Sequence, residues 1–148
     1  MSRIPLIAGN WKMNGARGEA LALGRELAKS VGQVPGREVV VAPPFPALEV
    51  VREVIDGTDI RLAAQNVYWE PKGAFTGEVS VGMLREAGCA YVIIGHSERR
   101  QYFGETNETV NRRLHACLAG NLTAIVCVGE TLEEREADAT AAVIERQV

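Results

Sequence analysis

The chain has 148 residues, of which 47% are hydrophobic, and its 16 basic and 19 acidic residues give a net charge of −3 at pH 7. This length predicts one domain and not two. Because no block of basic residues could follow a phosphate backbone, and no apolar run is long enough to cross a membrane, we expect neither a nucleic-acid nor a membrane partner.

Five short apolar runs alternate along the chain with segments of helical periodicity. The runs are Pro5–Ala8, Glu38–Ala42, Ile60–Ala64, Tyr91–Ile94 and Leu122–Val128. They are rich in Val, Ile and Leu without polar alternation, which is typical of strands covered on both faces. The alternation predicts an α/β fold in which helices connect five parallel strands.

The four segments between these strands show the spacing of helices, three of them with a clear apolar stripe. The stripes are Ala20, Leu23, Leu27 and Val31 in the first, Leu48, Val51 and Ile55 in the second, and Val110, Leu114, Cys117 and Leu118 in the fourth, while the third helix is shorter and spans Val81–Ala87. Gly32 is predicted to end the first helix in the left-handed conformation, and Gly57 and Gly120 to end the second and the fourth.

The last segment opens with Thr131–Glu134, a capping box that predicts a helix start. That helix reaches Val148 without a Gly, Asn or Pro to end it, so we expect a truncated chain. The strand spacing favours a TIM barrel, a (β/α)8 fold of about 250 residues, with strands 1–5 and the start of the fifth helix present. Residues 1–148 would then be the N-terminal part of one barrel domain. An open doubly wound sheet fits the same pattern, although no GxGxxG motif follows any strand.

Cys89, Cys117 and Cys127 are widely spaced and form no CxxC pair. They predict neither a disulfide framework nor a cysteine zinc site, and we interpret them as buried thiols of a reducing compartment. The N-terminal apolar run is too short for a signal sequence. The sequence therefore favours a cytoplasmic protein.

Polar residues follow the first predicted strand at Asn10–Gly15. In a parallel α/β fold the C-terminal ends of the strands converge on one face, where sites are built. Asn10 and Lys12 are two residues apart and can point to the same side, so Lys12 could hold an anionic substrate. A solvated loop lysine is the alternative interpretation.

The fourth predicted strand leads into Gly95–Arg100, with His96 at its tip and a short helix expected from Ser97. A helix N-terminus presents free N–H groups and a positive dipole end, which disfavour an imidazolium ion. A neutral His96 can polarise a carbonyl group by donating a hydrogen bond. The alternative is a structural imidazole satisfied by the backbone. His115, in the middle of a predicted helix, receives no role.

Gly95–Ser97 also begins like the GxSxG nucleophile elbow of serine hydrolases. Arg99 stands where that motif needs a small residue, and no HGGG-type run is present. A serine hydrolase is therefore a minor alternative, which active-site labelling with a fluorophosphonate would reveal.

The connection Asn66–Glu78, between the third strand and its helix, is longer than most βα loops. Its aromatic residues Tyr68, Trp69 and Phe75 could dock into a partner or pack on one another as an Ω-loop. The sequence leaves both interpretations open.

Four segments together resemble one family. Asn10–Gly15, Ala74–Glu78, Gly95–Arg100 and Cys127–Glu130 occur in the order found in triosephosphate isomerases. The resemblance extends over the whole chain, which is about three-fifths of a complete barrel. It implies a glycolytic and gluconeogenic enzyme that interconverts dihydroxyacetone phosphate and glyceraldehyde 3-phosphate without a metal or organic cofactor.

By this resemblance, Asn10 and Lys12 bind the substrate, and the Lys12 ammonium stabilises phosphate and enediolate charge. His96 is the catalytic electrophile that moves protons between the two substrate oxygens, and this family is itself the standard example of a histidine kept neutral by a helix N-terminus. Ser97 and Glu98 support the site, Glu98 by orienting Lys12.

The resemblance also implies a homodimer, in which Phe75, Thr76 and Gly77 lie in the loop that enters the neighbouring subunit. The family's general base, a glutamate after strand six, has no counterpart in this chain. Glu98 is a poor substitute, because a carboxylate near a helix N-terminus tends to a lowered pKa. We therefore expect the chain alone to lack isomerase activity and, with two unpaired sheet edges, to aggregate.

A different interpretation is a genuine half-barrel that serves as a non-catalytic binding or complementation module. Reading the coding DNA past Val148 separates the two. An immediate stop codon favours the module, whereas a continued helix, a strand ending near a glutamate and a later Gly-Gly loop favour the enzyme.

Overall fold

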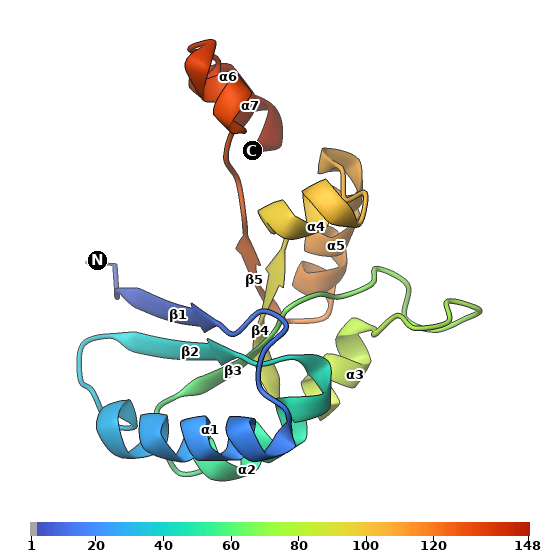
Figure 1. Ribbon diagram of the computed structural model, residues 1–148. Helices are drawn as coiled ribbons and strands as arrows, with labels where there is room; N and C mark the ends of the chain where they lie inside the picture. The colour runs from blue at the N-terminus through green and yellow to red at the C-terminus, as the bar shows by residue number, and fades with distance from the viewer. Residues whose placement is uncertain (1–2) are drawn as a thin grey trace.

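The computed structural model describes residues 3–148 as one curled sheet with helices between its strands (Figure 1). The strands are β1 (Leu6–Asn10), β2 (Glu38–Ala42), β3 (Arg61–Ala64), β4 (Cys89–Ile94) and β5 (Thr123–Val126). The helices are α1 (Arg17–Val31), α2 (Leu48–Ile55), α3 (Val81–Glu86), α4 (Ser97–Tyr102), α5 (Asn107–Ala119), α6 (Leu132–Glu136) and α7 (Thr140–Gln147), with a 3-10 turn at Phe45–Ala47.

All five strands are parallel, and each pairs with its neighbour in sequence in the order β1-β2-β3-β4-β5. The sheet curls into a half-barrel, and α1, α2, α3 and α5 lie on its outer side (Figure 1). This arrangement confirms the predicted α/β class and agrees with an incomplete (β/α)8 barrel. It also brings the C-terminal ends of the strands to one rim.

Alternate residues of the central strands belong to two separate apolar clusters, because successive side chains of a strand point to opposite faces. Val41, Leu62 and Val92 pack against the helices in the larger cluster. Val40 and Ala63 belong to the smaller cluster, on the opposite face of the sheet. Both faces are therefore covered, which explains why these strands show no polar alternation.

The edge strands β1 and β5 are more exposed than the centre of the sheet. Leu6 and Ile7 expose 42% and 57% of their surface, whereas Val92 and Ile94 of β4 expose at most 1%. Within residues 3–148 no further strand pairs with the outer edge of β1 or β5. The prediction that every apolar run is covered on both faces is correct for β2–β4 and wrong at the two edges.

Helix α1 packs through Ala20, Leu27 and Val31 of the predicted stripe, and also through Gly24. Gly24 is buried, and a Cβ there would lie 2.6 Å from Val54 Cγ2, so the glycine lets α1 approach α2 closely. Leu23, predicted to face the core, is 47% exposed. Gly32 has a φ of −64°, so its predicted left-handed conformation is wrong. Its carbonyl instead accepts a hydrogen bond from Asp59 N–H at 2.7 Å.

The capping box at Thr131 is confirmed, because its hydroxyl accepts from Glu134 N–H at 3.3 Å and its own N–H donates to the Glu134 carboxylate at 2.8 Å. The helix that it opens, α6, ends at Glu136. Asp138 then adopts a left-handed φ of 55°, which stops the helix, and α7 begins at Thr140. The prediction of one uninterrupted helix in this segment is wrong.

All three cysteines are free thiols, with Cys89 and Cys117 buried as predicted and Cys127 half-buried. Burial raises the pKa of Cys89 and of Cys117 to about 11, so both thiols stay protonated at neutral pH. Among residues 3–148, no helix combines the length and the apolar character needed to cross a membrane.

Candidate active site

The end of β1 holds Lys12 in a left-handed conformation with a φ of 53°, which is uncommon for a residue with a side chain. Its N–H donates to Asn10 Oδ1 at 2.9 Å, and its carbonyl accepts from Gln65 Nε2 at 2.8 Å. Gln65 also donates to the carbonyl of Ala42 at 2.7 Å. The ends of β1, β2 and β3 are therefore tied together around the backbone of Lys12. Backbone strain held in this way is typical of functional sites.

The side chain of Lys12 extends to the end of β4, where its Nζ lies 2.8 Å from Glu98 Oε1. The two side chains are 53% and 41% exposed, so solvent screens the ion pair. The hydrogen bond from Lys12 is the main cause that lowers the pKa of Glu98 below its ordinary value of 4.5, and burial opposes it. Glu98 is therefore ionised at neutral pH and holds the ammonium near His96.

His96 caps the N-terminus of α4, which begins at Ser97 as predicted. The Nδ1 atom of His96 accepts a hydrogen bond from Glu98 N–H at 3.3 Å. An accepting Nδ1 carries no proton, so the ring proton lies on Nε2. The Glu98 carboxylate is 3.6 Å from the same Nδ1, beyond hydrogen-bond distance, so the backbone N–H is the contact that sets the tautomer.

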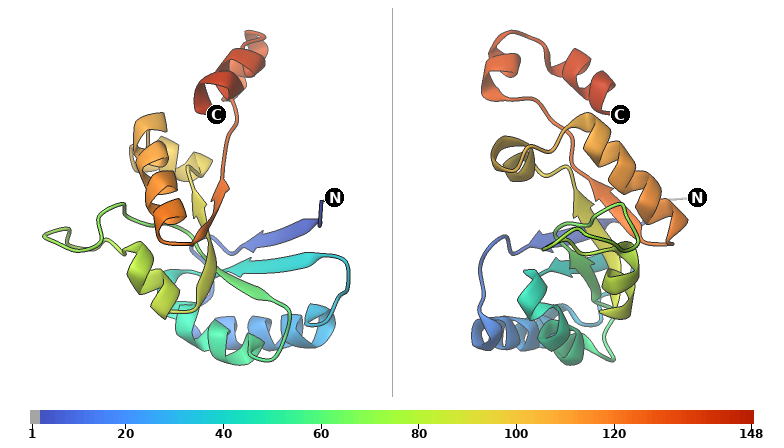
Figure 2. Two further views of the ribbon diagram at one scale, coloured as in Figure 1. Left: turned by 180° about the vertical axis from the view of Figure 1, so that it is seen from behind. Right: turned by 90° about the vertical axis from the view of Figure 1, so that its right-hand side faces the viewer.

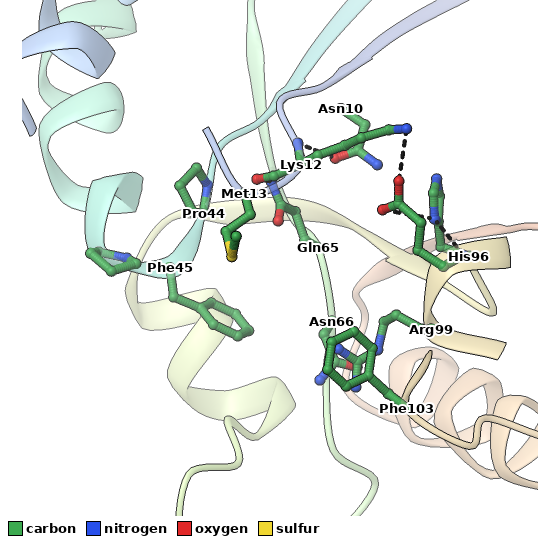
Figure 3. A pocket seen from close by; sticks show the side chains of 12 residues that line it. Asn10, Lys12, Met13, Pro44, Phe45, Gln65, Asn66, His96, Arg99 and Phe103 are labelled. Atoms are coloured by element: carbon green, nitrogen blue, oxygen red, sulfur yellow. Dashed lines mark hydrogen bonds and ion pairs between the residues drawn. The ribbon is translucent and has the colours of Figure 1, made fainter. Parts of the chain in front are cut away.

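A cleft of about 300 Å³ opens beside these groups (Figure 3). Its lining consists of Asn10, Lys12, Met13, Pro44, Phe45, Pro46, Gln65, Asn66, His96, Glu98, Arg99 and Phe103. Lys12 and His96 lie at one end of the cleft, and Phe45 and Phe103 at the other. Asn66 is only 8% exposed, and its Oδ1 has no hydrogen-bond partner within the described residues, which leaves an acceptor beside the cleft.

An ammonium ion and a neutral imidazole thus face one cleft. The ammonium of Lys12 can balance the charge of an anion, and the Nε2–H of His96 can donate to an oxygen on which negative charge develops. Within residues 3–148, no group of three or more His, Cys, Asp or Glu side chains could hold a metal ion. The arrangement suits acid–base chemistry on a small anionic carbonyl compound.

The predicted site residues lie in three places, namely the cleft, a second pocket and a loop outside both. Asn10, Lys12, His96 and Glu98 line the cleft together. Ser97 lies in a second pocket of about 230 Å³, which runs from His96 towards the residues that follow β5.

The loop between β3 and α3 supplies the remaining predicted residues. Its aromatic stem is self-packed, since the ring of Tyr68 lies 4.1 Å from that of Trp69 and 4.8 Å from that of Phe75, between centroids. The tip, which includes Thr76 and Gly77, is exposed and projects from the body of the molecule (Figures 1 and 2). These residues take no part in the cleft.

Two polar residues near the site were not predicted. Gln65 follows β3 directly, and the rule that polar residues gather at strand ends could have found it. Glu105 offered no such signal, because a glutamate between Gly104 and the capping residue Thr106 is expected in solvent. Its side chain is nevertheless only 2% exposed.

Comparison with known proteins agrees with this geometry. The family model described as "Triosephosphate isomerase" matches residues 5–148. A protein named triosephosphate isomerase from Pelobacter propionicus is 59% identical over 146 residues, which cover 99% of this chain. A protein of the same name from Rhodopirellula baltica is 54% identical over all 148 residues. In both cases the chain spans 58% of the length of the relative.

Proposed function

Because this chain belongs to the triosephosphate isomerase family, we propose that its full-length protein interconverts dihydroxyacetone phosphate and D-glyceraldehyde 3-phosphate. The full-length protein is this chain together with the residues that follow it in its gene. If the gene ends at Val148, the C-terminal part of the Pelobacter propionicus relative is joined to the chain instead. The observation that carries the proposal is the pairing of the Lys12 ammonium with a neutral His96 in one cleft. A triose phosphate offers an anion and a carbonyl oxygen, one for each group.

The isomerisation moves one proton between neighbouring carbon atoms and one between neighbouring oxygen atoms. A base removes the proton beside the carbonyl group while His96 donates its Nε2 proton to the carbonyl oxygen. The second oxygen then gives its proton back to His96, and the base returns its proton to the other carbon. The ammonium of Lys12 stabilises the negative charge of the intermediate enediolate. No atom is gained or lost.

Glu98 does not fit the role of that base. Its pKa lies below the ordinary value and its carboxylate is bound to Lys12, whereas a general base is most effective with a pKa near the working pH. We propose that the base lies in the part of the relatives' length that this chain does not span. Residues 1–148 are then the N-terminal part of one barrel domain and are inactive alone.

Two further parts of the proposal concern the whole protein, which we expect to be a cytoplasmic homodimer. The packed aromatic stem presents the exposed loop tip with little conformational freedom, which favours docking into a second copy. Light scattering of the full-length protein should give the mass of a dimer, and Thr76→Arg at the tip should give a monomer. Ser30→Arg, on the exposed side of α1, is the matched control and should leave the dimer intact.

A coupled assay that follows glyceraldehyde 3-phosphate tests the proposed activity. We expect turnover by the purified full-length protein and none above the buffer background by the 148-residue chain. A folded full-length protein without turnover would refute the isomerase, and turnover by the 148-residue chain would refute the missing base.

A further inference from the structure

Gly95, the residue that precedes His96, is held by two charged side chains. Arg100 Nε donates to the carbonyl of Gly95 at 2.8 Å, and the N–H of Gly95 donates to Glu105 Oε2 at 3.2 Å. Both bonds are made by side chains and not by a neighbouring strand or helix backbone. The backbone that carries His96 is therefore fixed by residues of α4 and of the turn after it.

The guanidinium of Arg100 joins three elements at this point. Besides Gly95, it donates from Nη1 to Asn107 Oδ1 at 2.7 Å and from Nη2 to the carbonyl of Cys127 at 3.4 Å. Asn107 begins α5, and Cys127 follows β5. A planar fork of donors suits such a junction, and a lysine could not reproduce it.

Glu105 is the buried partner of the N–H of Gly95. Its side chain is 2% exposed, accepts a hydrogen bond from Arg99 Nε, and lies 3.5 Å from Arg113 Nη2. A carboxylate in this setting keeps its position because each oxygen has a partner. One oxygen is engaged by the two arginines and the other by Gly95 N–H.

Gly95 leaves little room for adjustment within this arrangement. It has a φ of 70°, and a Cβ there would lie 3.1 Å from Val110 Cγ2 and 3.2 Å from the carbonyl oxygen of Cys127. The position of the His96 backbone follows from this packing, and the bond from Glu98 N–H to Nδ1 then fixes the ring.

We propose that Arg100 and Glu105 are positioning residues for His96, because they hold the carbonyl and the N–H of Gly95, the residue that precedes it. The inference rests on the proposed function, in which His96 Nε2–H meets a substrate oxygen. A misplacement of about 1 Å in a reacting group costs on the order of 100-fold in rate. Lys12 holds the anion independently, so the loss should fall on kcat and spare KM.

The test is Arg100→Ala in the full-length protein. We expect kcat to fall about 10- to 100-fold with KM changed less than about twofold, and added guanidinium to restore part of kcat. The ¹⁵N chemical shifts of the His96 ring, assigned with His96→Gln, should move as well. Arg25→Ala, which removes an exposed arginine of α1, is the matched control and should change none of these values.

Unchanged kcat and unchanged His96 shifts in Arg100→Ala would overturn the proposal. If Arg100→Ala does not fold, Arg100→Lys and Glu105→Gln replace it, since each keeps one partner for Gly95. Parental kcat and parental His96 shifts in both of these variants would overturn the proposal equally. A parent protein without isomerase activity refutes the proposed function alone, because the His96 shifts still report whether Arg100 positions the ring.

Discussion

The ends of β1 and β4 supply the two halves of the cleft in different ways. His96 follows a strand buried between two neighbours, and Gly95 before it is held by Arg100 and Glu105. Lys12 follows an edge strand in which Ile7 is 57% exposed, and its own side chain is 53% exposed. One half of the site is thus rigid within this chain, and the other lies on an open edge.

Two contacts from the interior compensate for that open edge. Gln65, directly after β3, fixes the backbone of Lys12, and Glu98, on α4, fixes its ammonium. The position of Lys12 therefore depends on residues that follow β3 and β4, although Lys12 itself follows β1. A polar group preorganised in this way is effective in catalysis because it need not rearrange during the reaction.

The largest effect is expected at the β4 end. His96→Gln in the full-length protein should lower kcat about 100- to 10,000-fold, the usual contribution of a general acid–base group, with little change in KM. His115→Gln is the matched control, because His115 is the other histidine of this chain and lies exposed on α5. Steady-state kinetics decide the matter, and equal activity of the two variants would contradict the role of His96.

Lys12→Met tests the β1 end. Loss of the ammonium should lower kcat/KM about 100- to 1,000-fold, since a charge aimed at the developing enediolate is removed. Lys29→Met, on the exposed side of α1, should be neutral. If Lys12→Met costs less than about tenfold, the open edge of β1 contributes no preorganised charge and the two halves of the cleft are not equivalent.

The same contrast explains what could be predicted from the sequence. The runs that became β2 to β4 were predicted well, because Val, Ile and Leu without alternation specify burial on both faces. His96 and Lys12 were found because strand ends converge on one rim. Glu105 was not, because its burial depends on arginines from α4 and α5 that no local pattern associates with it. Leu118, predicted in the core stripe of α5, is 61% exposed.

Ile7→Ala tests whether the exposed edge of β1 is covered in the full-length protein. In the proposed barrel, the rest of the domain covers Ile7, so the substitution should lower the free energy of unfolding of the full-length protein by about 2 kcal/mol or more. Leu118→Ala is the control and should change it by less than about 0.5 kcal/mol. Urea unfolding measures both, and equal values would argue against closure of the barrel over β1.

The smallest effect is expected for the ion pair between Lys12 and Glu98, which joins the two halves of the cleft. Because Lys12 holds the pKa of Glu98 below 4.5, the ion pair contributes stability above that pH and loses it as the pH falls through the lowered pKa. Lys12→Met should raise the pKa of Glu98 towards 4.5, whereas Lys29→Met should not. Carboxyl ¹³C titration by NMR measures the pKa of Glu98 in each variant. An unchanged pKa of Glu98 in Lys12→Met would mean that Glu98 does not hold the ammonium in solution. The position of Lys12 would then depend on the hydrogen bonds that its backbone makes with the side chains of Asn10 and Gln65.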